Sequence, residues 1–158
     1  KFFSKTKFEN LLEEIIESFR ETSSKEIYLV SDEDRNKINF QRSPELIYGL
    51  RNFVGNAVKF SKSIVEIKIF SNENFVEIQI IDDGPGFPDD IIEKLGEPYI
   101  KSKSSSVISN SGTGLGTFLG KTLLERQLAE LSFFNSSGKL GGALVKISWK
   151  VNNLASNV

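Results

Sequence analysis

The sequence predicts an α/β sandwich, in which helices cover one face of a mixed β-sheet. Segments with the apolar spacing of amphipathic helices occur in mixed order with short β-branched segments that have the spacing of strands. Two of the strand segments flank a short polar turn, which is typical of an antiparallel hairpin. The chain has 158 residues, a length that fits one domain with one hydrophobic core.

The first part of the chain predicts two helices and two short strands. Apolar residues recur at three- and four-residue intervals over residues 8–19, so we expect an amphipathic helix there. Residues 27–30 and 38–40 have the composition of short strands. Ser43-Pro44-Glu45 combines an N-cap, a proline at the first helical position and an early acid, so a second helix should run to about Phe60.

The second part of the chain predicts a hairpin, a lid and a third main helix. Residues 64–70 and 75–81 alternate around a polar turn, and the second strand delivers Asp82 at its end. Residues 101–111 are rich in Lys, Ser and Asn, and we expect them to form a mobile lid. The remaining expected elements are a short helix at 89–94, a helix at 114–128, and strands at 131–135 and 143–150.

The composition excludes several kinds of chemistry. The chain contains no histidine and no cysteine, so it has no His-dependent triad, no phosphoacceptor histidine and no thiolate site. Its net charge of -1 disfavours binding to nucleic acid, and no apolar stretch is long enough to span a membrane. Methionine is absent even at position 1, so we expect an excised domain at residues 1–151, with 1–7 ending an upstream linker and 152–158 a frayed tail.

The segment from Asn52 to Lys59 carries two carboxamides on one helix face. Asn52 and Asn56 are four residues apart, so both side chains can point into one cleft. A carboxamide oxygen can bind Mg²⁺ without adding negative charge beside a phosphate, and we assign Asn56 as the metal ligand. Lys59 shares the face and could contact a phosphate. Taken alone, two helical asparagines are more typical of a solvated surface, and only the neighbouring motifs favour a binding site.

The segment Asp82-Asp83-Gly84-Pro85-Gly86 follows a strand and places glycines beside an acid. Gly84 and Gly86 allow the backbone to approach a flat ligand, and Asp82 can accept a hydrogen bond from an adenine amino group. A plain turn at the strand end is the alternative.

The segment Gly112-Thr113-Gly114-Leu115-Gly116 leads from the expected lid into a helix. Its free backbone N–H groups and the helix dipole could hold phosphate oxygens. No Gly-Lys-Ser/Thr follows, and a polar loop rather than a strand precedes it, so neither a Walker A loop nor a dinucleotide-binding fingerprint is present. A glycine-rich hinge is the structural alternative, and a lid needs such hinges.

These segments, together with Glu97-Pro98-Tyr99, resemble in order and spacing the N, G1, F and G2 boxes of the GHKL ATPase/kinase superfamily. The chain is most similar to the catalytic ATP-binding (HATPase_c) domain of sensor histidine kinases. The resemblance implies a Bergerat-type fold with about three main helices on one sheet face, and Mg²⁺ and ATP as cofactors. It also implies that Asp82 reads the adenine, that the glycines shape the base pocket, and that Tyr99 and residues 112–116 belong to the nucleotide site.

Several segments look like the RegB/PrrB-type redox-responsive sensor kinases of α-proteobacteria. They are Leu95 to Tyr99, Gly120 to Arg126 and Val145 to Trp149. The F box departs from the usual pattern, with Gly96 for its first phenylalanine and Tyr99 for its second. Thr117 stands where the family usually has leucine or a similar apolar residue.

The residue four positions before Asn56 separates kinases from hydrolases in this superfamily. Hydrolytic members carry a glutamate there to activate water, whereas Asn52 is a carboxamide with no basic lone pair near neutral pH. The resemblance therefore implies a protein-histidine kinase domain that donates the γ-phosphoryl group to a histidine on a separate dimerisation domain of the same parent protein.

The expected partners are that histidine-phosphotransfer domain and a downstream response regulator, with no nucleic acid and no direct membrane contact by this domain. The expected location is the cytoplasmic part of a membrane-anchored bacterial sensor. Two alternatives stay open: an anti-sigma-factor-type serine kinase, and a nucleotide-free interaction module of the same fold.

Overall fold

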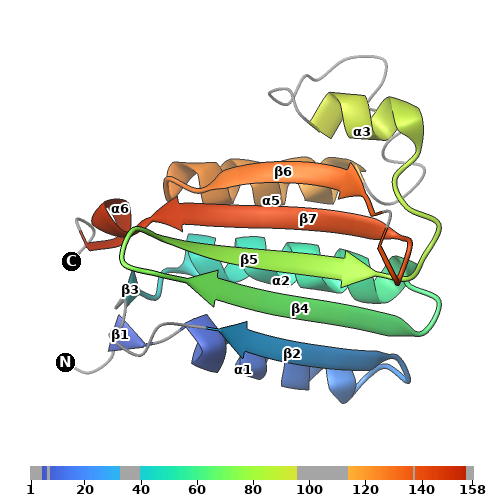
Figure 1. The fold of residues 1–158 in the computed structure, drawn as a ribbon, viewed down its shortest axis with the longest axis horizontal. Coiled ribbons are helices and arrows are strands. Elements are labelled where there is room, and N and C mark those ends of the chain that lie inside the picture. Colours follow the sequence, from blue (N-terminus) through green and yellow to red (C-terminus); the bar gives the residue numbers. More distant parts are fainter. Residues whose placement is uncertain (1–4, 7, 33–39, 96–113, 137, 156–158) are drawn as a thin grey trace.

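The computed structural model describes residues 5–6, 8–32, 40–95, 114–136 and 138–155. These residues form two layers, a β-sheet and a layer of three main helices that covers one of its faces (Figure 1). The predicted α/β sandwich is therefore confirmed.

The main sheet has five strands in the order β2-β4-β5-β7-β6. The strands are β2 (Glu26–Asp32), β4 (Ile64–Ser71), β5 (Phe75–Asp82), β7 (Ala143–Lys150) and β6 (Glu130–Asn135). The pair β2–β4 is parallel and the other three pairs are antiparallel, so the sheet is mixed as expected. The predicted hairpin is the pair β4–β5, and Asp82 is the last residue of the central strand β5.

The three main helices are α1 (Phe8–Arg20), α2 (Pro44–Phe60) and α5 (Gly114–Arg126). The predicted start of α2 is confirmed in atomic detail, because the Ser43 side chain accepts a hydrogen bond from the Leu46 N–H and Pro44 occupies the first helical position. The short helix α3 (Asp89–Leu95) follows β5 and lies near β6 (Figure 1).

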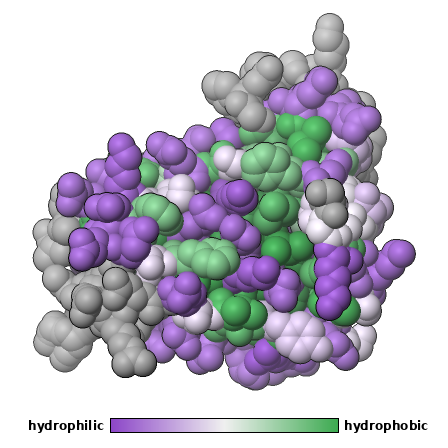
Figure 2. Space-filling model, viewed as in Figure 1, coloured by the Kyte–Doolittle hydropathy of each residue, from purple (hydrophilic) through white to green (hydrophobic). Residues whose placement is uncertain are grey.

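Alternate residues of the strands face the helices and form the core. Strand β4 alternates between buried and half-buried positions, and Val65, Ile67 and Ile69 on its inner side are fully buried. The opposite face of the sheet is largely hydrophilic with smaller apolar areas, as Figure 2 shows. One face of the sheet is therefore packed and the other is solvated, the usual division in sheets with antiparallel strands.

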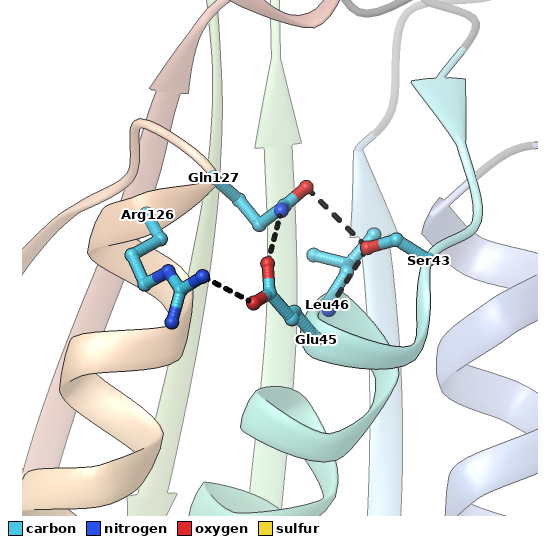
Figure 3. A network of polar contacts seen from close by, with 5 residues as sticks. All are labelled: Ser43, Glu45, Leu46, Arg126 and Gln127. Carbon is cyan, nitrogen blue, oxygen red and sulfur yellow. Dashed lines mark hydrogen bonds and ion pairs between the residues drawn. The ribbon is translucent and has the colours of Figure 1, made fainter.

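A network of polar contacts joins the start of α2 to the end of α5 (Figure 3). Glu45 accepts a hydrogen bond from Gln127 Nε2 at 2.9 Å and pairs with Arg126 Nη2 at 3.2 Å. Ser43 Oγ, which caps α2, also lies 3.3 Å from Gln127 Oε1. The two helices thus run antiparallel, and the second half of α2 lies beside the first turns of α5.

Three local expectations differ from the structure or lie partly outside it. The strand expected at 38–40 appears as β3 (Phe40–Gln41), which pairs with β1 (Lys5–Thr6) in a separate two-stranded sheet. The expected frayed tail is wrong up to residue 155, because Val151–Ala155 form helix α6 and Leu154 is only 4 % exposed. The expected lid at 101–111 lies outside the described residues.

None of the helices in the described part of the chain combines the length and apolarity needed to cross a bilayer.

Candidate functional site

A cavity of about 220 Å³ opens between the end of α2, the end of β5 and the start of α5. Most of its wall is apolar, and three polar side chains face it: Asn56, Asp82 and Thr117. The apolar lining consists of Phe53, Ala57, Phe60, Ile80, Pro85, Gly86, Phe87, Pro88, Ala143 and Val145. A mainly apolar wall with a few converging polar groups is the usual composition of a small-molecule site.

Asp82 is buried, with 5 % of its surface exposed, and its carboxylate is fixed by the backbone. Oδ1 accepts hydrogen bonds from the N–H groups of Gly84, at 2.8 Å, and Ala143, at 3.2 Å. Burial raises the pKa of Asp82 above its ordinary value, and these two hydrogen bonds only partly oppose the shift. No described residue donates to Oδ2, which leaves that oxygen able to accept a hydrogen bond from a ligand.

The neighbouring Asp83 does not line the cavity, and its carboxylate is held by a loop instead. Its carboxylate accepts hydrogen bonds from the N–H groups of Lys62, Ser63 and Ile64, and from the Ser63 hydroxyl, between α2 and β4. Burial alone would raise the pKa of Asp83, but the hydrogen bonds from Ser63, Ile64 and Lys62 outweigh it and lower the pKa. The two adjacent aspartates therefore differ in role: Asp83 fastens a loop, whereas Asp82 faces the cavity.

The segment after Asp82 is held to the sheet by Asn135 at the end of β6. Asn135 Oδ1 accepts from the Phe87 N–H at 2.7 Å, and Asn135 Nδ2 donates to the Phe87 carbonyl at 3.0 Å. The Phe87 ring also meets Phe133 edge-on, with 6.1 Å between centroids. Gly86, just before Phe87, has a φ of +85°, a conformation that favours glycine. These contacts fix one wall of the cavity.

The two expected nucleotide-binding helices meet closely at Asn52 and Asn56. Asn56 Nδ2 donates a hydrogen bond to Thr117 Oγ1 on α5 at 3.0 Å. A Cβ atom on Gly116 would lie 3.2 Å from Asn52 Oδ1, so the first turn of α5 passes directly beside Asn52. Asn52 itself does not line the cavity but packs against α5 next to it.

The other expected site residues are distributed as follows. Lys59 is exposed and does not line the cavity; its ammonium nitrogen lies 5.3 Å from the ring centroid of Phe60, which does. Gly84 does not line the cavity, and its N–H donates a hydrogen bond to Asp82 Oδ1. Gly114 and Leu115 begin α5. Tyr99, Gly112 and Thr113 lie outside the described residues.

Most of the apolar wall, and two positions that shape it, were not predicted from the sequence. Gly142 precedes β7, and a Cβ atom there would lie 2.3 Å from Asp82 Oδ1 and 2.4 Å from the Asp82 carbonyl oxygen. Asn135 was predicted only as the end of a strand. The pair Gly141-Gly142 before β7 was a signal for a close backbone approach, but nothing local linked Asn135 to Phe87.

The sequence that forms this fold belongs to a class of ATPases. Residues 41–153 match the family of histidine kinase-, DNA gyrase B- and HSP90-like ATPases, and the chain belongs to this family. The family predicted from the four boxes is therefore confirmed.

Within the family, the chain is similar to sensor histidine kinases. It is 39 % identical over 127 residues to sensor histidine kinase RegB of Cereibacter sphaeroides, an alignment that covers 72 % of this chain and 28 % of RegB. The predicted likeness to RegB-type kinases is confirmed. The chain spans little more than a quarter of the length of that relative.

Solved structures agree on the fold. The catalytic domain of histidine kinase ThkA, in a nucleotide-free form, superimposes with a TM-score of 0.72 at 17 % identity, covering 97 % of this chain and 99 % of that domain. A mycobacterial sensor histidine kinase, MprB, gives a TM-score of 0.69 at 19 % identity, covering 92 % of this chain and 95 % of that one. This chain therefore shares its fold with both of these solved structures.

Proposed function

We propose that this chain binds ATP with Mg²⁺ and donates the γ-phosphoryl group to a histidine on a separate dimerisation domain. In this role it is the kinase half of a two-component sensor. The observation that carries the proposal is the buried Asp82 carboxylate beside an apolar cavity whose other polar groups are Asn56 and Thr117.

The cavity suits a flat heterocycle better than a whole nucleotide. Its volume of about 220 Å³ is below the roughly 300–1,000 Å³ of sites that enclose a drug-sized ligand. Phe60, Phe87 and Val145 offer apolar contact to the faces of a ring, and Asp82 Oδ2 can accept from an exocyclic amino group. Adenine carries such an amino group, whereas guanine has a carbonyl at the corresponding ring position, so the site should prefer ATP to GTP.

The residues present fit a magnesium ion that arrives with the triphosphate. Among the described residues there is no cluster of three or more histidine, cysteine or acidic side chains that could hold a metal by themselves. Mg²⁺ commonly keeps water and phosphate ligands and takes only one or two oxygens from the protein. Asn56 would supply one such oxygen, and the ion would neutralise charge on the transferring phosphoryl group.

Asn52 favours transfer to a protein over hydrolysis. The side chain packs beside the first turn of α5, close to Asn56, and a carboxamide cannot take a proton from water near neutral pH. Phosphoryl transfer needs mainly positioning and charge stabilisation, so the acceptor can reside on another domain. The chain itself contains no histidine to serve as that acceptor.

We extend the proposal to the parent protein from its similarity to RegB. The parent would be a membrane-anchored bacterial sensor with this domain on the cytoplasmic side, and its phosphorylated histidine would pass the phosphoryl group to a response regulator. Respiratory or redox state is the signal that this similarity favours.

Calorimetric titration with a nonhydrolysable ATP analogue, with Mg²⁺ and then with EDTA, tests the nucleotide site. We expect saturable binding that Mg²⁺ strengthens, and we expect Asn56→Ala to remove the Mg²⁺-dependent gain. Asn10→Ala, at an exposed asparagine on α1, is the matched control and should bind as the parent does. Absence of saturable heat in the parent would refute nucleotide binding.

Kinase activity is tested by adding a histidine-bearing dimerisation domain with labelled ATP. We expect an acid-labile phosphoryl label on the added domain and none on this chain. An acid-stable label on a serine, or rapid release of phosphate without any labelled protein, would contradict the proposed reaction even if the nucleotide is bound.

A further inference from the structure

The Asn56 carboxamide has two chemically different ends, and only one of them can meet a cation. The oxygen accepts hydrogen bonds and can bind a metal, whereas the NH₂ group only donates. Rotation of the amide by half a turn would present the NH₂ group in place of the oxygen. A site that uses the oxygen therefore needs a partner that holds the nitrogen end.

Thr117 is placed to hold that end. Its hydroxyl oxygen lies 3.0 Å from Asn56 Nδ2 and accepts the hydrogen bond, and both side chains line the cavity. Thr117 is 3 % exposed, so its hydroxyl is one of the few buried polar groups in the described part of the domain. In helices, a threonine hydroxyl commonly donates its own proton to a carbonyl one turn earlier, which leaves the oxygen as an acceptor for a second partner.

The helix pair that carries this contact is fixed on both sides of it. Glu45, Arg126 and Gln127 join the far ends of α2 and α5 (Figure 3). At the near end, Gly116 lets α5 approach Asn52 so closely that an added Cβ would be 3.2 Å from its amide oxygen. Thr117 therefore cannot easily move away from Asn56.

We propose that Thr117 is a positioning residue: its hydroxyl oxygen holds the Asn56 amide nitrogen and thereby turns the Asn56 amide oxygen toward the cation of the nucleotide. No described residue donates a hydrogen bond to that oxygen, so it is available. The inference rests on the proposed nucleotide-binding function. It gives a reason for threonine at a position where the sequence alone showed only a departure from the usual apolar residue.

The first test compares variants of Thr117 in the ligand-free domain. Thr117→Val keeps the shape and removes the hydroxyl, Thr117→Ser keeps the hydroxyl, and Thr122→Val is the control at an exposed threonine on the same helix. Proton–nitrogen correlation spectra report the Asn56 NH₂ group, identified by its loss in Asn56→Ala. We expect its signals to shift in Thr117→Val and to stay near the parent positions in Thr117→Ser.

The second test measures binding of the nonhydrolysable ATP analogue with Mg²⁺ and with EDTA. Removing one net hydrogen bond should reduce the Mg²⁺-dependent affinity of Thr117→Val about 3- to 10-fold. Affinity in EDTA should stay at the parent value, and Thr117→Ser should restore the Mg²⁺ effect. In an Asn56→Ala background, Thr117→Val should cause no further loss, because it acts through Asn56.

The outcomes separate this inference from the proposed function. If the parent binds the analogue and responds to Mg²⁺ while Thr117→Val behaves identically, the positioning role is wrong and the nucleotide site stands. Equal losses with Mg²⁺ and with EDTA would also overturn it, because Thr117 would then only form the cavity wall. If the parent shows no Mg²⁺ effect, the proposed function fails and this inference fails with it.

Discussion

Replacement of Asp82 by asparagine should make the domain more stable and worse at binding ATP. The parent carboxylate is buried, and burial raises its pKa. Asparagine keeps one oxygen, which can still accept from the Gly84 and Ala143 N–H groups. The substitution removes the charge whose burial opposes folding. It also replaces the oxygen that would accept a hydrogen bond from the ligand with an NH₂ group, which can only donate.

The binding loss follows from the hydrogen bond that disappears. A hydrogen bond to a charged group contributes about 1.5–3 kcal/mol, and each ~1.4 kcal/mol changes an affinity tenfold. We therefore expect Asp82→Asn to weaken binding of a nonhydrolysable ATP analogue about 10- to 100-fold and to reduce discrimination against the GTP analogue. Calorimetric titration of both analogues measures the two effects.

The difference in stability between Asp82→Asn and the parent should depend on pH. Because the folded-state pKa of Asp82 is raised, its contribution to the free energy of unfolding is greatest below the ordinary aspartate pKa of 3.8 and is lost as the pH rises through the folded-state pKa. The advantage of Asp82→Asn over the parent should therefore grow from acid to neutral pH. Urea unfolding at a series of pH values measures it.

The neighbouring aspartate provides a control of opposite sign. The pKa of Asp83 is lowered, so its stabilising contribution is present above the ordinary value of 3.8 and is lost as the pH falls through the lowered pKa. Asp83→Asn should reduce stability at neutral pH and leave discrimination between the ATP and GTP analogues unchanged. If Asp82→Asn lowered stability at neutral pH, or kept the discrimination of the parent, the reasoning about its buried acceptor would be refuted.

Three further substitutions test the framework of the site. Lys25→Met removes the ammonium group that donates to the carbonyls of Val58 and Ser61 at the end of α2, each at 2.8 Å. It should lower the free energy of unfolding, measured in urea, by about 2 kcal/mol. Lys62→Met, at an exposed lysine, is the control. Leu128 has a φ of 71° where α5 ends, so Leu128→Gly should be more stable than Leu128→Ala by about 1 kcal/mol, and equal thermal midpoints would contradict the assigned strain. Gly142→Ala would place a methyl group 2.3 Å from Asp82 Oδ1. It should lower the free energy of unfolding by about 1–3 kcal/mol and also lower the affinity for the ATP analogue. If stability and affinity both stayed at the parent values, the backbone at this position would have to shift to accept the methyl group.

The elements were largely predictable because their signals are local. The cap at Ser43, the proline after it and the apolar period fixed the start of α2, and alternation on both sides of a polar turn fixed the β4–β5 hairpin. The end of α5 was placed two residues late, because Leu128 adopts a conformation that favours glycine and carries no local sign of it. Helix α6 was missed because burial of Leu154 against the core, not helix propensity, stabilises it.

The sequence by itself determined the fold class and the family, because motif spacing and hydrophobic period are properties of neighbouring residues. It also singled out Asn56 and Asp82 as candidates for the site, but it did not single out Thr117. Only the tertiary structure decided that Asp82 faces a cavity while Asp83 fastens a loop, that Asn135 holds Phe87, and that Thr117 meets Asn56. These pairings join residues up to 61 positions apart, and they depend on which helix face meets which strand. That arrangement is set by packing of the whole core, to which no local pattern gives access.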